Sequence, residues 1–286
     1  MGANELHQMG IGEILDVAIK LYRRNAWTLF RIVLVIAVPL TLLTNFILIS
    51  AIPAHETPRV ETIGNQLFFV TSPTRSQWHT ILAGFFVAGV LVMIGYLTAT
   101  GAAYKAVAEA FLGEQPNWKR SLAFAARRMH SLLWVSVLGG LIVVVTWFFL
   151  VIPGLYLAVS FTVAIPVVMT EGLRGRKALG RSRRLIKKRW WRTFALLFLG
   201  SILSVILFYA AALLIFAVTA EEGQRSVVGV ATNVVAISVL TALTIPFAAA
   251  YTTVLYFDLR VRREAFDLQL LALQVGVDAP PEAQSP

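Results

Sequence analysis

The chain alternates between long runs without charge and short segments in which charged residues are dense. Each uncharged run is close to the roughly 20 residues that a helix needs to cross the hydrocarbon core of a bilayer. The sequence therefore predicts an all-α membrane protein with six transmembrane helices. Their expected bounds are about 27–52, 81–103, 131–152, 155–170, 193–220 and 226–256.

The six predicted spans pair as three hairpins. The second hairpin has no polar connection, because residues 131–170 carry no charge and are divided only by an Ile-Pro-Gly turn signal at 152–154. Its second arm, 155–170, is short for a full crossing, so we expect the turn to lie below the far membrane surface. In the outer loop of the first hairpin, RVETI and QLFFV flank a Gly-Asn pair at 64–65 and predict a small β-hairpin.

Residues 171–192 contain ten of the chain's 25 Lys and Arg residues. Moving ten such charges to the bilayer centre would cost about 25–35 kcal/mol, so this segment must stay at one membrane surface. Read as a helix, it separates Ala178, Leu185 and Ile186 from most of its cations, which predicts a helix lying in the interface. The same separation predicts further interfacial helices at 11–24, 117–130 and 257–274.

Three segments share one order of features: a basic amphipathic helix, an aromatic residue and then an outward span. The returning spans each end near an acidic residue, at Glu109, Glu171 and Asp258. We interpret the chain as three repeated units that form a single membrane domain over 1–276. The Pro-rich tail at 277–286 is predicted to be disordered.

The Lys and Arg residues segregate strongly between the two sides that six spans define. The side that holds both termini, 104–130 and 171–192 carries twenty-one of them, and the other side carries three. Short loops rich in Lys and Arg stay in the cytoplasm of a membrane protein. We therefore expect both termini to be cytoplasmic.

A hydrophobic content of 58% and a mean hydropathy of +0.74 exclude an ordinary soluble domain. The net charge of +10 does not indicate nucleic-acid binding, because no soluble segment exceeds about thirty residues. Anionic lipid headgroups are the expected counter-charge. A chain without cysteine has no disulfide, no thiolate metal site and no cysteine nucleophile.

Five clustered cations are the predicted contacts for anionic headgroups. Each Lys or Arg near an anionic leaflet gains about 1 kcal/mol, so a dense cluster should bind measurably. The five residues are Arg183, Arg184, Lys187, Lys188 and Arg189. We also expect this face to organise a membrane or cytoplasmic protein partner or a homo-oligomer.

No catalytic, cofactor or metal site is predicted. The four His residues are scattered without acidic companions at metal-ligand spacing, and phosphate-binding and serine-hydrolase motifs are absent from the sequence. Polar residues inside the spans, such as Thr41, Asn45 and Asn233, are interpreted as contacts between helices. A polar path for a solute is the alternative, although no Asp, Glu, His or Lys stands at mid-bilayer.

Several acidic residues lie beside arginines at the cytoplasmic boundary: Glu171, Asp258, Glu264 and Asp267. We predict that they form ion pairs that fix the interfacial helices to one another. The alternative is a catalytic carboxylate pair, Glu171 with Asp258, which would make the protein a lipid-modifying enzyme.

Four motifs carry a family resemblance: LYFDLRVRREAFDL from residue 255, IPG at 152–154, AIPVVMTEG at 164–172 and ALGRSRRL at 178–185. Together they resemble bacterial proteins described as the membrane domain of glycerophosphoryl diester phosphodiesterase. The opening IGEILDVAIKLYRRN is similar to that family's opening too. The residues that the resemblance marks are Pro153, Gly154, Glu171, Arg181, Ser182, Asp258, Arg260, Arg262 and Glu264.

The resemblance implies a multi-pass protein of the bacterial inner membrane with no assigned activity of its own. In family members that hydrolyse phosphodiesters, the chemistry belongs to a separate soluble barrel, which this sequence does not contain. The hypothesis is therefore a non-enzymatic protein that binds anionic lipid and organises partners. A transporter or channel for a small solute or lipid is the second hypothesis, because repeated hairpins with proline-broken spans can surround a substrate.

Overall fold

The computed structural model describes residues 8–51, 59–63, 66–70, 75–219 and 227–264. It is an all-α membrane fold in which six helical segments are long and apolar enough to cross a membrane. The six segments are α2 (Ala26–Ala51), α3 (Arg75–Phe111), α5 (Met129–Phe149), α6 (Val151–Phe161) with α7 (Ala164–Thr170), α9 (Trp190–Thr219) and α10 (Val227–Glu264). The contacts of α2 with α3, α5 with α6 and α9 with α10 confirm the three predicted hairpins.

The helix ends depart from the predicted bounds mainly in the returning spans. The predicted 81–103 span is extended at both ends in α3, and the predicted 226–256 span continues to Glu264 in α10. The predicted 155–170 span is divided at residues 162–163 into α6 and α7. Pro166 has no N–H to donate to the carbonyl of Thr162, which explains a break at this position.

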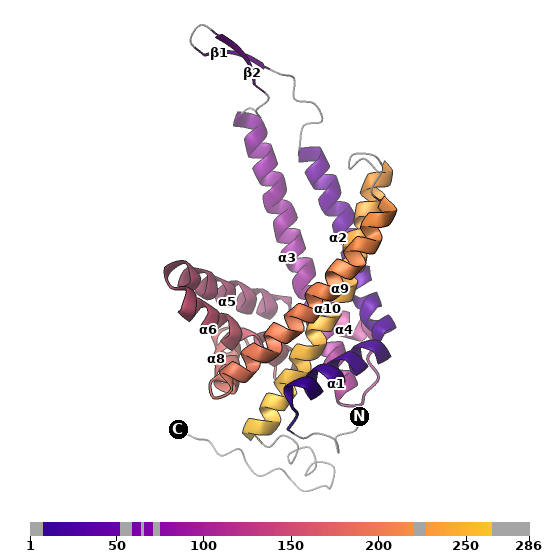
Figure 1. Ribbon diagram of the computed structural model, residues 1–286, viewed down its shortest axis with the longest axis vertical. Helices are drawn as coiled ribbons and strands as arrows, with labels where there is room; N and C mark the ends of the chain where they lie inside the picture. Colours follow the sequence, from indigo (N-terminus) through magenta and orange to yellow (C-terminus); the bar gives the residue numbers. More distant parts are fainter. Residues whose placement is uncertain (1–7, 52–58, 64–65, 71–74, 220–226, 265–286) are drawn as a thin grey trace.

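Three short amphipathic helices gather at one end of the molecule: α1 (Ile11–Arg24), α4 (Trp118–Arg127) and α8 (Arg176–Ile186). They lie at the end opposite β1 and β2 (Figure 1). Each buries its apolar stripe, for example Ala178, Leu185 and Ile186 of α8, and turns its cations outward. We call this end of the molecule the basic surface.

The predicted interfacial helix at 257–274 is wrong for residues 257–264, and residues 265–274 lie outside the described part of the chain. Phe257–Glu264 continues α10 without a break. Its first residues are buried on all sides, because Phe257 stacks on Phe111 at 4.9 Å between ring centroids and Asp258 is 0% exposed. Asp258 and Glu264 pair with Arg192 of α9 and Arg181 of α8, and with Arg262 and Arg260 of α10 itself, whereas Arg263 is exposed. The predicted tail at 277–286 also lies outside the described residues.

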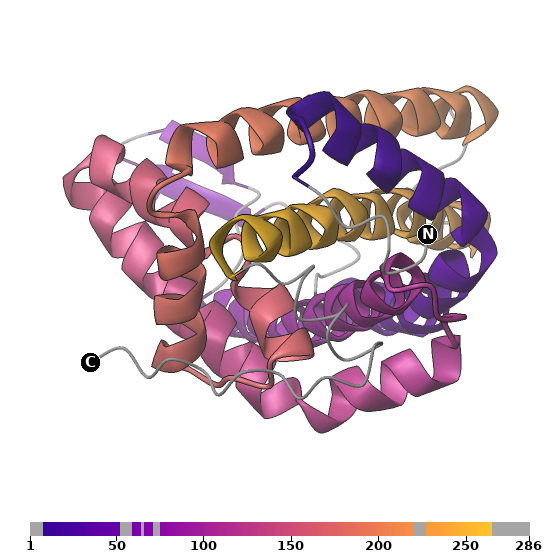
Figure 2. The ribbon, with the colours of Figure 1, turned by 90° about the horizontal axis from the view of Figure 1, so that it is seen from below.

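The second half of α10 forms the centre of the structure. Every residue from Ala249 to Leu259 is buried, and α10 contacts α1, α2, α3, α7, α8 and α9. Viewed from the basic surface, α10 lies in the middle with other helices on both sides of it (Figure 2). The core of the protein is therefore arranged around one helix that carries Thr252, Tyr256 and Asp258 into its interior.

The small β-hairpin predicted in the first loop is present. β1 (Arg59–Ile63) pairs antiparallel with β2 (Gln66–Val70), with Ile63 opposite Gln66. The predicted turn residues at 64–65 lie outside the described residues. At the far end of the molecule from the basic surface (Figure 1), this hairpin gives the outer loop a defined pairing register.

The α5–α6 hairpin closes over a glycine. A Cβ atom placed on Gly154 would lie 2.7 Å from the Cα and 2.9 Å from the backbone N of Trp147. Contacts this short with backbone atoms cannot be relieved by a side-chain rotation. Only a residue without a Cβ therefore allows α6 to approach α5 this closely.

Replacing Gly154 with valine is expected to destabilise the protein by about 1–3 kcal/mol, because the added methyl groups force the two helices apart. Thermal unfolding in detergent measures the change. Gly140→Val is the matched control, since Gly140 is an exposed glycine of the same hairpin with no heavy atom within 4 Å of its ideal Cβ position. Equal melting temperatures for the two variants would contradict the role assigned to Gly154.

Candidate functional site: a basic pocket beside an aromatic stack

The five predicted lipid-contacting cations lie at the end of α8 and in the short link to α9. Arg183, Arg184, Lys187, Lys188 and Arg189 are all exposed. The apolar stripe of α8 packs inward, so the intervening positions must face outward. None of the five forms an ion pair with a residue in the described part of the chain, and their charge is available to an external anion.

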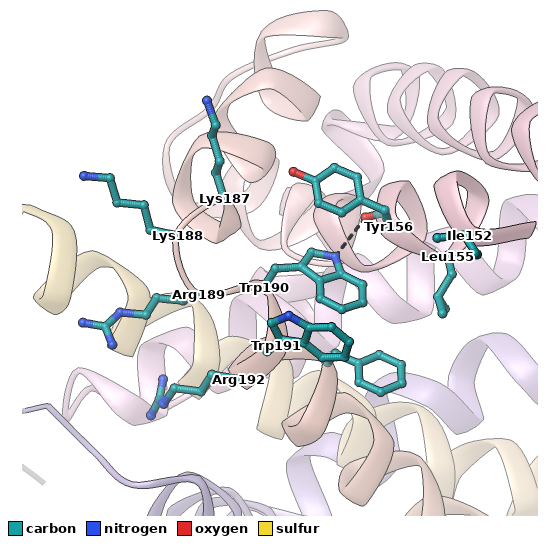
Figure 3. Close-up of a pocket in the computed structure, with 10 residues that line it drawn as sticks. Ile152, Leu155, Tyr156, Lys187, Lys188, Arg189, Trp190, Trp191 and Arg192 are labelled. Atoms are coloured by element: carbon teal, nitrogen blue, oxygen red, sulfur yellow. Dashed lines mark hydrogen bonds between the residues drawn. The ribbon is translucent and has the colours of Figure 1, made fainter.

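A pocket of about 760 Å³ opens next to these cations. Its walls come from two separate parts of the chain, the start of α6 and the segment from Lys187 into α9 (Figure 3). The ten lining residues are Ile152, Leu155, Tyr156, Lys187, Lys188, Arg189, Trp190, Trp191, Arg192 and Phe194. We call this cavity the basic pocket.

Three aromatic rings form a stack along one wall of the basic pocket. Trp190 stacks on Tyr156 at 5.8 Å and on Phe194 at 5.4 Å between ring centroids. The indole N–H of Trp190 also donates to the backbone carbonyl of Tyr156 at 3.2 Å, which fixes the ring against α6 (Figure 3). Lys187, Lys188 and Arg189 point away from this stack in the same view.

The basic pocket therefore combines cations with an exposed apolar surface. Trp191 is 77% exposed and Ile152 is 82% exposed. Tryptophan and arginine side chains commonly lie at the boundary between hydrocarbon and headgroups, where one end is apolar and the other is polar. The arrangement suits an amphiphile that carries an anionic group beside a hydrocarbon chain.

A partly buried ion-pair network ties α8 to α7 and α10 behind the pocket. The Arg181 guanidinium donates to Glu171 Oε2 at 2.8 Å from Nε and to Glu264 Oε2 at 2.8 Å from Nη2, with a further bond from Nη1 to Glu264. The Tyr256 hydroxyl donates to Glu171 Oε1 at 2.8 Å. Burial alone would lower the pKa of Arg181, but its bonds to Glu264 and Glu171 outweigh that effect and leave the pKa raised.

A second network surrounds the fully buried carboxylate of Asp258 on α10. Arg192 Nη1 donates to Asp258 Oδ2 at 2.6 Å, and Arg262 Nε lies 3.0 Å from both oxygens. The backbone N–H of Met9 donates to Oδ1 at 2.9 Å, while both arginines donate to the Met9 carbonyl. The network joins the segment before α1 to α9 and α10.

The acidic residues that end the three returning spans each pair with an arginine. Glu109 Oε1 of α3 lies 3.1 Å from Arg120 Nη2 of α4. Glu171, at the end of α7, pairs in the same way with Arg181 of α8. In both cases the partner belongs to the amphipathic helix that follows the span. The third acid, Asp258, pairs within α10 and with α9. In two of the three repeated units, the acidic residue at the end of the returning span therefore binds the amphipathic helix of the next unit.

The residues marked by the family motifs fall into three places. Glu171, Arg181, Arg260 and Glu264 share the first network, in which Arg260 Nε donates to Glu264 Oε2 at 3.2 Å. Asp258 and Arg262 share the second network. The remaining three are Pro153 and Gly154, which lie in α6, and Ser182, which lies in α8. The Ser182 hydroxyl joins the two helices by donating to the Ser160 carbonyl of α6 at 2.7 Å.

Comparison of the chain with protein-family models, with curated proteins and with solved structures found no match. The resemblance to the glycerophosphoryl diester phosphodiesterase membrane domain stays a prediction from sequence motifs.

The two carboxylates considered as a catalytic pair belong to different networks. Glu171 and Asp258 each accept hydrogen bonds on both oxygens from arginine side chains, and Glu171 accepts one more from Tyr256. Among the described residues, no group of three or more His, Cys, Asp or Glu side chains could hold a metal ion. The fourth acidic candidate, Asp267, lies outside those residues. What the geometry offers chemically is anion binding at the basic pocket.

Sequence reasoning did not single out Arg192, Met9 or the stack of Tyr156 and Trp190. Arg192 looks like one more cation of a basic segment, and its partner Asp258 lies sixty-six residues away. Trp190 and Trp191 could be interpreted as interface anchors from their position before a span. The contact of Trp190 with α6 depends on how the α5–α6 hairpin packs against α8 and α9. The local sequence pattern does not predict that packing.

Replacing Glu171 with glutamine is expected to lower stability by about 1.5–3 kcal/mol, because charge-assisted bonds from Arg181 are lost in a partly buried site. The midpoint of thermal unfolding in detergent measures the loss. Asp16→Asn is the matched control, since Asp16 pairs with Lys20 at 2.7 Å on the exposed face of α1, where an ion pair contributes at most about 1 kcal/mol. A Glu171 variant as stable as the control would contradict a structural role for the network.

Proposed function

We propose that this chain is a non-enzymatic multi-pass protein of the bacterial inner membrane that binds anionic phospholipid at its cytoplasmic face. The bound lipid and the surrounding cationic helices organise a membrane or cytoplasmic partner there. The observation that carries the proposal is the basic pocket, where Lys187, Lys188 and Arg189 border the aromatic stack of Tyr156, Trp190 and Phe194.

The chemistry of the pocket supports a phospholipid more strongly than a soluble anion. A phosphate needs only the cations, but the exposed apolar wall that includes Ile152 and Trp191 would remain in contact with water beside a small ion. A phospholipid covers both kinds of surface, with its phosphate at the cations and an acyl chain along the wall. The proposal therefore assigns one amphiphilic ligand to the whole pocket.

The sidedness in the proposal rests on the distribution of charge. The described cations of α1, α4, α8 and the end of α10 lie at the basic surface, and the positive-inside rule places such a surface in the cytoplasm. The cytoplasmic leaflet carries anionic lipid, which is the ligand that the pocket would need. The family resemblance from the sequence supports the bacterial inner membrane as the location of the protein.

Fluorescence quenching tests the proposal directly. Purified protein is reconstituted into phosphatidylcholine vesicles that contain increasing fractions of phosphatidylglycerol with brominated acyl chains, which quench nearby tryptophan. The signal of the basic pocket is the difference between the wild-type protein and Trp191→Phe. We expect this signal to saturate at a low fraction of brominated phosphatidylglycerol and to be restored by unbrominated phosphatidylglycerol. Equal quenching by brominated phosphatidylcholine would contradict selective binding of anionic lipid.

A further inference from the structure

A second cavity, of about 400 Å³, lies between α2, α3 and α10 and shares no residue with the basic pocket. Along α2 its lining extends from Val33 to Leu48, a distance of about 22 Å at the rise of an α-helix. It is therefore long and narrow, with the proportions of one extended hydrocarbon chain. All three walls belong to helices that are apolar enough to span the membrane.

The cavity lining contains six polar side chains. The hydroxyls of Thr41, Thr44 and Thr241 donate to carbonyls of their own helices, which leaves the amides of Asn45 and Asn233 and the hydroxyl of Tyr96. Asn45 Nδ2 donates to the Thr41 carbonyl at 2.8 Å and to Asn233 Oδ1 at 3.4 Å. Within the described part of the chain, Asn45 Oδ1, Asn233 Nδ2 and the Tyr96 hydroxyl have no hydrogen-bond partner. Asn233 and Tyr96 are exposed at the open side of the cavity, where lipid chains offer them no hydrogen bond, so a ligand that satisfies these groups gains free energy.

The polar groups also define the chemistry and depth of the ligand. The cavity lining contains no charged residue, which disfavours an ionic headgroup. Asn45 lies six residues before the end of α2 and Asn233 six residues after the start of α10, so both amides are about 9 Å inside the helix ends remote from the basic surface. A ligand would enter from that side and extend its chain toward Val33.

We propose that this cavity binds one chain of an uncharged long-chain lipid alcohol, whose hydroxyl lies between Asn45 and Asn233. The hydroxyl accepts a hydrogen bond from Asn233 Nδ2 and donates one to Asn45 Oδ1, because a hydroxyl is both a donor and an acceptor. The hydrocarbon chain fills the apolar part of the cavity beside Val33 and Ile245. The site is independent of anionic lipid binding at the basic pocket.

Photolabelling with a long-chain monoacylglycerol that carries a diazirine near its chain end tests this site. We expect the label to map to α2 and α10 peptides that line the cavity. Replacing both Asn45 and Asn233 with leucine should lower labelling roughly tenfold, since two hydrogen bonds in a membrane setting are lost. Ser201→Leu on the exposed face of α9 is the control and should leave labelling unchanged.

Three results would overturn the proposal: equal labelling of the double variant and the control, labels distributed over the lipid-facing surface of α9, or equal competition by a charged phosphatidic acid. A melting curve of the double variant tests whether it is folded. If the variant unfolds, Asn45→Gln with Asn233→Gln supplies the second test, because these amides keep their polarity but shift position. Its labelling should fall by at least severalfold, and unchanged labelling would overturn the site.

The turn of the α5–α6 hairpin supports an independent inference. Its sequence, WFFLVIPGL at 147–155, has no charged residue, whereas the other connections on the predicted outer side contain Arg59 and Arg225. The side chains at the turn are highly exposed, with Phe148 84% accessible. A turn that reached the far surface would place this apolar cluster in water. The turn is therefore suited to the hydrocarbon core.

The contacts of α6 place the hairpin beside the basic surface. Ile152, next to the turn, lines the same pocket as Lys187, although a full crossing would separate them by about 30 Å. The bond from Ser182 to the Ser160 carbonyl holds α6 against α8, and the bond from Trp190 to the Tyr156 carbonyl holds α6 against the start of α9. In Figure 1, α5 and α6 run at a steep angle to α2 and α3.

We infer that α5 and α6 form a re-entrant hairpin, which enters and leaves the membrane from the side of the basic surface. Four helices, α2, α3, α9 and α10, then make the full crossings. Because the α5–α6 hairpin enters and leaves the membrane on one side, every other segment stays on the side that six full crossings would give it. The hairpin also brings an apolar wall within reach of the cations, which is what creates the basic pocket.

The absence of cysteine from the sequence makes this inference easy to test. A bimane fluorophore on Phe148→Cys reports its depth through quenching by phospholipids that carry nitroxides at different positions along the acyl chain. We expect the strongest quenching from nitroxides within the chains, and no reaction of Phe148→Cys with an impermeant maleimide from either side. Ser50→Cys and Lys187→Cys mark the two surfaces. Reaction of Phe148→Cys from the side on which Ser50→Cys reacts would overturn the inference.

Discussion

Replacing Asp258 with asparagine is expected to destabilise the protein by about 3–5 kcal/mol, the typical effect of removing one partner from a buried ion pair. The Asp258 carboxylate is completely buried and is bonded to Arg192, Arg262 and the Met9 N–H. The variant leaves two partly buried guanidinium groups without their anion. It also loosens the attachment of the chain before α1 to the central helix.

A double-mutant cycle separates this effect from a general loss of packing. Arg192→Gln and Asp258→Asn are each compared with the double variant by thermal unfolding in detergent. Because the two side chains share one hydrogen bond at 2.6 Å, the double variant should lose clearly less stability than the sum of the single variants. Additive losses would show that the pair is not coupled, and would contradict the network as described.

Neutralising the five exposed cations of the basic pocket region is expected to remove the preference for anionic lipid. The variant converts Arg183, Arg184, Lys187, Lys188 and Arg189 to glutamine. If each cation retains about half of the roughly 1 kcal/mol that it can gain at an anionic leaflet, the loss is about 2–3 kcal/mol, or a preference that is weaker by a factor of about 30 to 140. The brominated-lipid titration measures this preference against phosphatidylcholine.

A control with the same change in net charge distinguishes the pocket from the overall charge of the surface. Its five substitutions to glutamine lie at exposed cations elsewhere on the basic surface: Arg23, Arg24, Lys119, Arg127 and Arg263. This control should keep most of the preference. A loss as large as that of the first variant would show that the pocket has no special role.

Much of the fold can be predicted from the pattern of charge and hydropathy. A segment such as 171–192 cannot enter hydrocarbon, and its apolar positions recur at helical spacing, so an amphipathic helix with Ala178, Leu185 and Ile186 inside follows directly. The long uncharged runs predict transmembrane helices because each is about as long as a helix that crosses the hydrocarbon core. The Ile-Pro-Gly motif at 152–154 predicts the second hairpin, but the break lies at Leu150 and the motif belongs to the first turn of α6.

The contacts between distant segments could not be predicted in this way. Residues 257–264 have the charge pattern of a surface helix, but the partners of Asp258 and Glu264 come from α9 and α8, and together they bury the segment. A pairing over that distance depends on the packing of several helices around α10. The basic pocket has the same origin, since Tyr156 and Trp190 meet only when the second hairpin folds against α8.

The central claim is that the cationic helices share one membrane surface, at which anionic lipid is bound. Single cysteines at Lys187, Arg263 and Ser50, in a chain that has no other cysteine, test it with an impermeant maleimide in sealed vesicles of known orientation. We expect Lys187→Cys and Arg263→Cys to react together in inverted vesicles and Ser50→Cys to react in right-side-out vesicles. Reaction of Lys187→Cys and Arg263→Cys in vesicles of opposite orientation would contradict it.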